Sequence, residues 1–298
     1  MTTGVDGQIL RGSSRLAAYA NFVKVAHTVF ALPFVAVGIA AAARLGPVPW
    51  SDVGRAVVAF TAARFAAMGF NRIVDRHYDA LNPRTAGREL PSGRMSPTEA
   101  WGLVIGMSVL FLLAVAGINR LCLALAPLAL AWILGYSYTK RFTALCHGWL
   151  GISLAIAPVG GFLAATGRWS NPWWLLVLLA SGVASWVAGF DLLYSLQDED
   201  FDREHRLMSG TVTLGAPTAI LVARMLHLVA IISLAMFGMA AGFERIYLVG
   251  VALAALVLVW EHRLVRPYDY SRLDAAFFTM NGLISGIVMV GAVADVLL

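Results

Sequence analysis

The stretch GFDLLYSLQDEDFDREHRLMS, residues 189–209, follows a long apolar run and gathers acidic side chains where a membrane-spanning helix would emerge into water. On an α-helix that turns by about 100° per residue, Asp191, Asp198 and Asp202 fall within about 20° of one line. Asp200 points to the opposite side. We therefore predict a row of carboxylates on one face of this helix end, and we call residues 189–209 the second acidic segment.

A weaker version of the pattern, GFNRIVDRHYDALN, occupies residues 69–82, which we call the first acidic segment. Asn71, Asp75 and Asp79 recur every four residues and form an oxygen-rich stripe that drifts by about 80° around a helix. Like charges in a row repel one another, so such a row is stable mainly when a cation lies against it. The two acidic segments are therefore the predicted functional centre.

The composition indicates a polytopic helical membrane protein. Apolar residues make up 59% of the 298 residues and charged residues only 13%, and long apolar runs recur throughout the chain. The formal charge of +5 is spread among the loops between these runs, which membrane topology explains better than nucleic-acid binding. Cys122 and Cys146 lie near opposite ends of predicted spans, and we interpret both as packing residues rather than a disulfide.

About nine spans around a central cavity are predicted, in a single integral-membrane domain covering residues 1–298. Residues 1–15 form a polar tail that we expect to be disordered and cytoplasmic. Each span is long enough to cross about 30 Å of hydrocarbon, and eight or ten spans are the alternatives. The predicted spans are 16–43, 52–81, 97–118, 121–138, 144–166, 172–198, 214–242, 245–262 and 272–298.

The basic residues predict the orientation. With the N-terminus inside, fifteen of the 22 Lys and Arg residues fall in inner segments and five in outer loops, while Arg64 and Arg224 lie within spans. This bias favours an N-inside topology and places both acidic segments on the cytoplasmic face. We therefore expect a protein of a bacterial-type inner membrane with its active site near the cytoplasmic face.

The two acidic segments also hint at internal repetition. The tripeptides GFN at residues 69–71 and GFD at residues 189–191 lie 120 residues apart, each near the inner end of an even-numbered span. Four helices per repeat would place both in the same orientation, as in a parallel duplication. Because the carboxylate spacings of the two segments differ, a duplication and a chance match of three residues remain open alternatives.

The chemistry of the acidic segments favours a hard cation. Carboxylates without His or Cys companions suit Mg²⁺ before Ca²⁺ or Zn²⁺. Mg²⁺ keeps several waters and takes one or two carboxylates plus substrate phosphate oxygens, so two facing segments suit a bound diphosphate. The candidate catalytic and metal-binding residues are Asn71, Asp75, Asp79, Asp191, Asp198 and Asp202.

Basic residues supply the complementary charge. The loop NPRTAGRELPSGRMS, residues 82–96, carries three arginines, and a short inner loop carries Lys140 and Arg141. Basic side chains beside carboxylates are what an anionic leaving group requires. Ordinary inside-positive loops are the alternative, which explains the arginines but not two aligned acidic rows. The candidate substrate-binding residues are Arg64, Arg72, Arg88, Lys140, Arg141, Tyr194, Lys24 and His27.

Several of these residues have more than one open role. Arg64 lies on nearly the same face as Asn71 and roughly 10 Å deeper. An intramembrane Arg usually faces a polar cavity or a carboxylate, so it can bind diphosphate, bind an acidic group on a second substrate, or neutralise an Asp. Lys24 and His27 either line the same cavity or are a snorkelling Lys and a packed His. Tyr194 can hydrogen-bond the diphosphate or face a developing cation.

These residues resemble the UbiA superfamily of intramembrane aromatic prenyltransferases. The resemblance covers nearly the whole chain, because it includes Arg64, the loop RELPSGRMS at residues 88–96, and the YTKR element ending at Arg141. Both signatures of the superfamily are matched, as Asn71-x3-Asp75-x3-Asp79 and Asp191-x2-Tyr194-x3-Asp198-x3-Asp202.

One branch of that superfamily is the most similar. The runs KVAHTVFALPF and FDLLYSLQDEDFD look most like the 4-hydroxybenzoate polyprenyltransferases, a branch that includes the MqnP relatives assigned to menaquinone synthesis by the futalosine route. The segment DREHRLMSGTVTLG departs from that branch, because it lacks the expected Ile-Pro pair after the Ser. This departure weakens the assignment to the branch but not to the superfamily.

The resemblance implies a Mg²⁺-dependent transfer of a polyprenyl group from its diphosphate to a ring carbon of an aromatic acid. The acceptor would be 4-hydroxybenzoate or a menaquinone precursor, in ubiquinone or menaquinone biosynthesis. Mg²⁺ would be held by Asp75, Asp79, Asp198 and Asp202, and Lys140, Arg141 and Arg88 would bind the diphosphate. Asn71 and Asp191 would place the ions or orient the phosphate. The isoprenoid tail would lie in an apolar groove open to lipid.

Two other functions fit the sequence less well. A CDP-alcohol phosphotransferase also uses Asp-rich helices and Mg²⁺, but its four aspartates sit in one motif with an Ala-Arg pair that is missing here. A cation transporter with an acidic inner mouth predicts acidic residues at mid-membrane depth. The plainly intramembrane charges of this chain are basic, namely Arg64 and Arg224.

Overall fold

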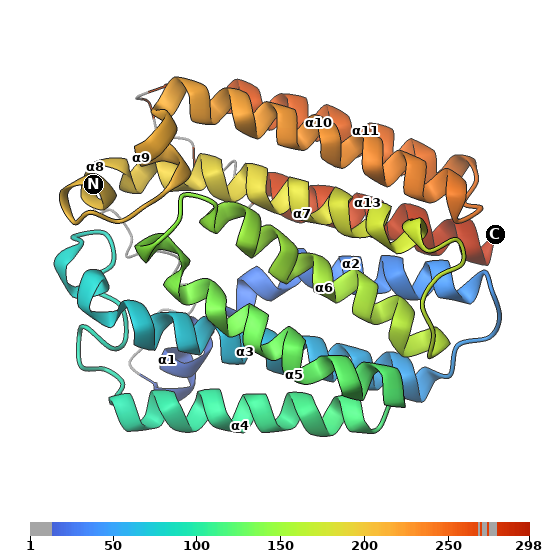
Figure 1. The fold of residues 1–298 in the computed structure, drawn as a ribbon, viewed down its shortest axis with the longest axis horizontal. Helices are drawn as coiled ribbons and strands as arrows, with labels where there is room; N and C mark the ends of the chain where they lie inside the picture. The colour runs from blue at the N-terminus through green and yellow to red at the C-terminus, as the bar shows by residue number, and fades with distance from the viewer. Residues whose placement is uncertain (1–13, 268, 270–272, 274–278) are drawn as a thin grey trace.

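The structure is a computed structural model that describes residues 14–267, 269, 273 and 279–298. Figure 1 shows an elongated bundle of roughly parallel and antiparallel helices joined by short connections. Residues 1–13 of the predicted tail, and residues 272 and 274–278 of the predicted ninth span, lie outside the described residues. Within the described part the architecture is all-α, as predicted.

The long helices of the bundle follow the predicted spans closely. They are α1 (Arg15–Phe22), α2 (Val25–Ala43), α3 (Trp50–Leu81), α4 (Pro97–Ala116), α5 (Arg120–Gly135), α6 (Cys146–Thr166), α7 (Trp174–Tyr194), α10 (Ala216–Ala240), α11 (Arg245–Leu264) and α13 (Asn281–Leu297). Four short helices connect them: η1 (Tyr136–Arg141), η2 (Ser195–Asp198), α8 (Glu199–Glu204) and α9 (Gly210–Leu214).

Length and composition confirm an integral membrane protein. In the described part of the chain, seven helical stretches are long and apolar enough to cross a membrane. Two shorter apolar stretches, Ala31–Ala43 in α2 and Asn281–Leu297 in α13, coincide with the first and last predicted spans. The predicted count of nine is therefore approximate, and each predicted span overlaps at least one described helix.

The first predicted span is not one continuous helix. Lys24 adopts a left-handed backbone conformation with φ 48° and ψ 59°, so α1 ends at Phe22 and α2 begins at Val25. An L-residue other than Gly, Asn or Asp visits this conformation rarely, because its Cβ crowds the following carbonyl. The sequence pattern gives no sign of this break, since the residues around it continue the apolar run. The break leaves Lys24 buried.

Small residues allow the helices of the core to approach closely. A Cβ atom on Gly161 of α6 would lie 2.5 Å from the Val35 carbonyl oxygen of α2, and one on Gly151 would clash with the Ala184 carbonyl of α7. Close backbone approach through small residues is the usual packing mode of membrane helices. Between these helices and α10, Trp186 and Phe237 are completely buried.

The C-terminal ends of α3 and α7 reach the same end of the bundle. Figure 1 shows α8, α9 and the connection that follows α3 at this end, on the left, while the C-terminus lies at the opposite end. We call this end, formed by the C-terminal ends of α3 and α7 together with η1, α8 and α9, the polar end. Both acidic segments therefore lie at one end of the molecule, as predicted.

Candidate active site

The two acidic segments line one cavity at the polar end. Its volume is about 240 Å³, and we call it the polar cavity. All six candidate catalytic residues line it: Asn71, Asp75, Asp79, Asp191, Asp198 and Asp202. Seven of the eight candidate substrate-binding residues line it as well: Lys24, Arg64, Arg72, Arg88, Lys140, Arg141 and Tyr194. The side chain of His27 lies outside the described residues.

The first acidic segment keeps regular α-helical geometry to its end. Asn71 Nδ2 donates a hydrogen bond of 2.8 Å to Asp75 Oδ2, one helical turn away. Arg141 Nη2 lies 3.3 Å from the other oxygen of Asp75, Oδ1. Arg88 Nη1 donates to Asp79 Oδ1 at 2.6 Å, and Asp79 is buried. Each acidic residue of this segment thus has a polar or basic partner inside the cavity.

The loop after α3 folds back because of local turn chemistry. Asn82 Oδ1 accepts a hydrogen bond from the Arg84 backbone N–H at 2.9 Å, a side-chain turn that Asn favours. The Thr85 hydroxyl donates to the Asp79 carbonyl oxygen at 3.0 Å. These bonds turn the chain across the end of α3 and direct Arg84 toward the second acidic segment.

Arg84 and Asn82 bind Asp198 of the second acidic segment. Arg84 Nε donates to Asp198 Oδ1 at 3.1 Å and Arg84 Nη2 donates to Oδ2 at 2.6 Å, a two-pronged contact. Asn82 Nδ2 adds a bond of 3.2 Å to Oδ1. The sequence analysis noted Arg84 only as one of the loop arginines and did not place it or Asn82 in the site. Their position just after Asp79 was the available signal.

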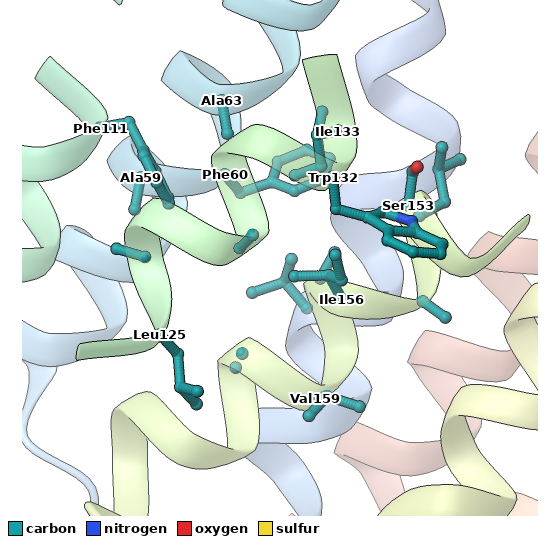
Figure 2. Close-up of a pocket in the computed structure, with 18 of the residues that line it drawn as sticks. Ala59, Phe60, Ala63, Phe111, Leu125, Trp132, Ile133, Ser153, Ile156 and Val159 are labelled. Carbon is teal, nitrogen blue, oxygen red and sulfur yellow. The ribbon is translucent and has the colours of Figure 1, made fainter. Parts of the chain in front are cut away.

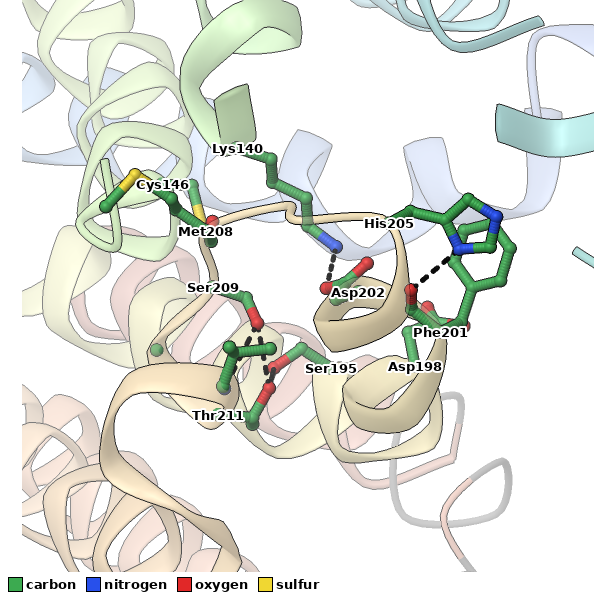
Figure 3. Close-up of polar contacts among 12 residues, drawn as sticks. Lys140, Cys146, Ser195, Asp198, Phe201, Asp202, His205, Met208, Ser209 and Thr211 are labelled. Carbon is green, nitrogen blue, oxygen red and sulfur yellow. Dashed lines mark hydrogen bonds and ion pairs between the residues drawn. The ribbon is translucent and has the colours of Figure 1, made fainter. Parts of the chain in front are cut away.

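Lys140 joins η1 to the second acidic segment. Its Nζ donates to Asp202 Oδ2 at 3.0 Å, and Asp202 is buried (Figure 3). The Lys140 carbonyl oxygen accepts a hydrogen bond from the Met208 N–H at 2.6 Å, so backbone and side chain both contact the segment. Both the side chain and the backbone of Lys140 are therefore held beside the cavity.

Asp191 has a partner that the sequence analysis missed. His147 Nδ1 lies 2.6 Å from Asp191 Oδ2, and the imidazole is buried in the first turn of α6. His147 follows Arg141 by six residues in an otherwise apolar stretch, and no pattern in the sequence links it to Asp191. Only the packing of α6 against α7 brings the two together.

The second acidic segment is not one regular helix, and this corrects the predicted geometry. The α-helix α7 ends at Tyr194, a 3₁₀ turn follows over Ser195–Asp198, and α8 then runs over Glu199–Glu204. A 3₁₀ turn advances by about 120° per residue, so the carboxylate row calculated for a continuous α-helix does not hold. Asp191, Asp198 and Asp202 still face one cavity, and Asp200 is exposed as predicted.

The oxygen donors fit a hard cation bound together with a phosphate group. Among the described residues, no three His, Cys, Asp or Glu side chains form a ready-made metal cage. Asp79 Oδ2, however, is buried without a hydrogen-bond partner, with Arg72 Nη1 4.0 Å away. An incomplete set of carboxylate oxygens is what Mg²⁺ uses when substrate phosphates and waters complete its shell.

A second, apolar cavity of about 460 Å³ adjoins the polar cavity. Figure 2 shows its walls, with Ala59, Phe60 and Ala63 on α3, and Trp132, Ser153 and Ile156 from α5 and α6. Five residues line both cavities: Arg64, Met68, Tyr136, Leu150 and Leu154. The site therefore joins a charged compartment to a hydrophobic compartment at Arg64 and Tyr136.

Arg64 occupies this junction without a described carboxylate partner. Its Nε atom is buried and makes no hydrogen bond. Of the three roles left open by the sequence, neutralising an Asp is the one that the described contacts do not support. Binding an anionic group on a substrate fits a buried, unmatched guanidinium.

Comparison with known proteins gives consistent matches over most of the chain. The model of the UbiA prenyltransferase family matches residues 31–283. A 4-hydroxybenzoate octaprenyltransferase of Nitrosospira multiformis is 29% identical over 234 residues, 78% of this chain and 79% of that protein. The apo structure of a UbiA homologue from Aeropyrum pernix K1 is 35% identical, with a TM-score of 0.83 over 90% of this chain and 98% of that one.

A third match concerns the fold. The structure of a UbiA homologue from Archaeoglobus fulgidus bound to GPP and Mg²⁺ superposes with a TM-score of 0.71, over 94% of this chain and 100% of that chain. Its sequence identity to this chain is 19%, so the likeness concerns the arrangement of helices.

Proposed function

This chain belongs to the UbiA prenyltransferase family, and from that premise we propose that it transfers a polyprenyl group from polyprenyl diphosphate to a ring carbon of an aromatic acid, with Mg²⁺. It is an integral-membrane aromatic prenyltransferase. Because the chain belongs to this family, we set aside the two other functions considered from the sequence, a CDP-alcohol phosphotransferase and a cation transporter.

The observation that carries the proposal is the junction of the two cavities. A polyprenyl diphosphate has a charged head and an apolar tail, and the polar and apolar cavities share Arg64 and Tyr136. The head fits among the bases and carboxylates at the polar end. The tail fits along the apolar walls of α3, α5 and α6.

The bases and acids of the polar cavity have separate roles in the proposed reaction. Arg88, Lys140 and Arg141 bind the diphosphate oxygens and stabilise the negative charge that grows as the allylic C–O bond breaks. Asp75, Asp79, Asp198 and Asp202 would hold Mg²⁺, which neutralises the diphosphate. Asn71 orients Asp75 through its hydrogen bond. The ion and its ligand set rest on the donor chemistry and on the Mg²⁺ bound to the A. fulgidus homologue.

The remaining residues face the organic parts of the substrates. Asp191 and Tyr194 line the polar cavity, and in the proposed reaction they would stabilise the positive charge on the allylic carbon, as carboxylates and aromatic faces do. Arg64 binds the carboxylate of the aromatic acid at the junction. 4-Hydroxybenzoate is the first acceptor to test, because the relative from Nitrosospira multiformis is named a 4-hydroxybenzoate octaprenyltransferase. A menaquinone precursor is the second.

The direct test uses purified protein in detergent, a labelled polyprenyl diphosphate and a panel of aromatic acids, with Mg²⁺ or EDTA. We expect one acid to give a prenylated product that disappears with EDTA and in Asp75→Ala and Asp198→Ala. The matched control is Asp200→Ala, because Asp200 belongs to the same segment and is exposed on the other side. Folded protein that forms no product and releases no diphosphate would contradict the proposal.

The proposed location is the inner membrane, with the N-terminus and the polar end on the cytoplasmic side. The excess of Lys and Arg at the polar end supports this orientation. A cysteine introduced at Asp200 should react with a membrane-impermeant maleimide in inside-out vesicles and stay unlabelled in intact spheroplasts. Labelling in intact spheroplasts would show that the polar end faces the opposite side of the membrane.

A further inference from the structure

His147 links Asp191 to the Gly210 backbone at the start of α9. Its Nδ1 atom lies 2.6 Å from Asp191 Oδ2, and its Nε2 atom lies 3.1 Å from the Gly210 backbone nitrogen. His147 is 5% exposed, so most of its surface is covered by protein groups. Both ring nitrogens are thus occupied by protein groups of different kinds.

The Gly210 contact fixes which nitrogen of His147 carries hydrogen. A backbone N–H can only donate, so Nε2 must accept with its lone pair. The ring hydrogen then lies on Nδ1 and is donated to Asp191. A ring with hydrogen on both nitrogens would set two N–H groups against each other at Gly210. The hydrogen-bond network therefore assigns the neutral Nδ1–H form.

The Gly210 backbone is itself held firmly. Ser209 caps α9 by accepting from Val212 N–H at 3.3 Å, and its hydroxyl lies 3.0 Å from the Thr211 hydroxyl. Thr211 in turn lies 3.4 Å from Ser195 Oγ in η2 (Figure 3). We call residues 208–211 the docking turn, because it joins η1, α6 and the second acidic segment.

Glycine at position 210 is required by the space beside His147. A Cβ atom there would lie 2.6 Å from Leu192 Cδ1 and 3.1 Å from His147 Cδ2. Ordinary van der Waals contact begins near 3.4 Å, so a larger residue at this position would crowd both Leu192 and the imidazole. The sequence meets this need with the Ser-Gly pair at the start of α9.

The pairing leaves Asp191 different from its neighbours. Asp198 and Asp202 are each matched by a charged Arg or Lys, so their pairs carry no net charge. A neutral imidazole donates a hydrogen bond without cancelling the carboxylate charge. Asp191 is therefore held in one orientation by a hydrogen bond rather than by an Arg or Lys side chain, and its side chain remains 23% exposed.

We propose that His147 is a positioning residue for the prenyl transfer: with hydrogen on Nδ1 it holds the Asp191 carboxylate against the docking turn, oriented toward the reacting allylic group. This inference rests on the proposed function for its catalytic consequence. Its structural part, the tautomer and the Gly210 bond, holds independently of the substrate.

Two substitutions separate the two bonds of His147. Asn places an N–H donor near the position of Nδ1 and leaves Gly210 without an acceptor. Gln reaches the position of Nε2 and keeps an acceptor for Gly210, but it offers Asp191 no donor. The matched control is His205→Asn, because His205 lies in the same region and bonds the Phe201 carbonyl oxygen rather than a carboxylate (Figure 3).

The kinetic test compares kcat with KM in these variants. We expect His147→Gln to lower kcat by roughly 10- to 100-fold with KM for both substrates little changed, since a second-layer partner of an active-site ligand has effects of this size. His147→Asn should recover most of that loss, and His205→Asn should match the wild type. The positioning role would be overturned if kcat fell equally in His147→Asn and His147→Gln and in proportion to the loss of folded protein.

Two measurements test the inference without any turnover. In protein labelled with ¹⁵N-histidine, NMR should show one ring, absent from His147→Asn, with hydrogen on Nδ1 and a lone pair on Nε2. Hydrogen–deuterium exchange of a peptide covering the docking turn should speed up in His147→Asn and stay slow in His147→Gln. Hydrogen on both nitrogens, or unchanged exchange in His147→Asn, would refute the inference.

Failure of the inference and failure of the proposed function give different results. A wild-type protein that is inactive with every acceptor would contradict the proposed function, and the NMR and exchange results would still decide the tautomer and the Gly210 bond. An active wild type whose kcat is matched by that of His147→Gln would contradict the inference and leave the proposed function in place.

Discussion

The two acidic segments share one cavity but obtain their partners differently. In the first, Asn71 bonds Asp75 within α3, and Arg88 reaches Asp79 from the loop that follows the same helix. In the second, the three acids that line the cavity are bound from distant parts of the chain: Asp198 by Arg84, Asp202 by Lys140 and Asp191 by His147. Arg141, which contacts Asp75, is the described long-range partner of the first segment.

The backbone follows the same division. The first segment is regular α-helix to Leu81, whereas the second passes from α7 through a 3₁₀ turn into α8. A regular helix places its side chains by local geometry alone, but a broken one needs tertiary contacts to hold its acids in place. The first segment is thus positioned by its own helix, and the second by the rest of the molecule.

Removing one acid from each segment has the largest expected effect. Asp79→Asn and Asp202→Asn each delete a buried carboxylate charge from the polar cavity. If the segments are equal partners in one site, both should lower kcat by about 100-fold or more, the usual loss for a group that stabilises transition-state charge. Turnover measured with saturating substrates checks this. A variant with near wild-type kcat would show that its segment does not take part in the reaction.

Conservative changes of two arginines sharpen the difference between local and distant partners. Arg84 contacts Asp198 with two nitrogens, whereas the described bond of Arg88 to Asp79 uses one. Lysine cannot reproduce a two-pronged contact, so we expect Arg84→Lys to lower kcat/KM about tenfold and Arg88→Lys to lower it less. Steady-state kinetics of the two variants, side by side, decide this. A larger loss in Arg88→Lys would reverse the order.

The paired glycines of the segments differ in the neighbour each would meet. A Cβ on Gly189 would clash with the His227 ring of α10, while one on Gly69 would lie 2.9 Å from Val104 Cγ2 of α4. We expect Gly189→Ala to destabilise the protein by about 1–3 kcal/mol and Gly69→Ala by less. Reversible unfolding in mixed micelles measures both.

The control for these glycines is Gly106→Ala. A Cβ at this position of α4 meets no atom within 4 Å, so its free energy of unfolding should not fall. Equal destabilisation in all three variants would point to a general loss of helix packing.

Both segment glycines face the next long helix in the chain, as a parallel duplication would require, but the duplication stays a prediction.

The smallest effect is expected on the exposed side of the second segment. Arg203 pairs with Glu199 one turn away on α8, and the Arg203 side chain is 59% exposed. Exposed pairs of this kind contribute about 0–1 kcal/mol, so Arg203→Ala should change neither activity nor stability measurably. A marked loss of activity would mean that α8 is ordered by its own surface rather than by Lys140 and Asp202.

The sequence predicted the features of the site that depend on period and charge. The stripe of Asn71, Asp75 and Asp79 follows from helical spacing, and the depth of Arg64 follows from its distance to that stripe. Apolar run lengths predicted the second to eighth spans to within about four residues of the observed helix ends. Such properties are local, so one stretch of sequence is enough to state them.

What the sequence did not predict depends on contacts between distant residues. The left-handed Lys24 and the 3₁₀ turn at Ser195 have no Gly or Pro within five residues that would mark a break in the helix. Arg84 and His147 became site residues only when their connections were folded against α7. A single sequence contains no period or spacing that reports such contacts.

The pairing of acids with bases in the polar cavity has a thermodynamic consequence. Opening the Asp198–Arg84 pair releases a carboxylate for a cation and a guanidinium for an anion at the same moment. A ligand that takes one partner therefore lowers the cost for the ligand that takes the other. By reciprocity, metal and diphosphate would each tighten the binding of the other by the same factor. Such coupling would make the cavity hold both ligands or neither, so that ionisation starts only from the complete assembly.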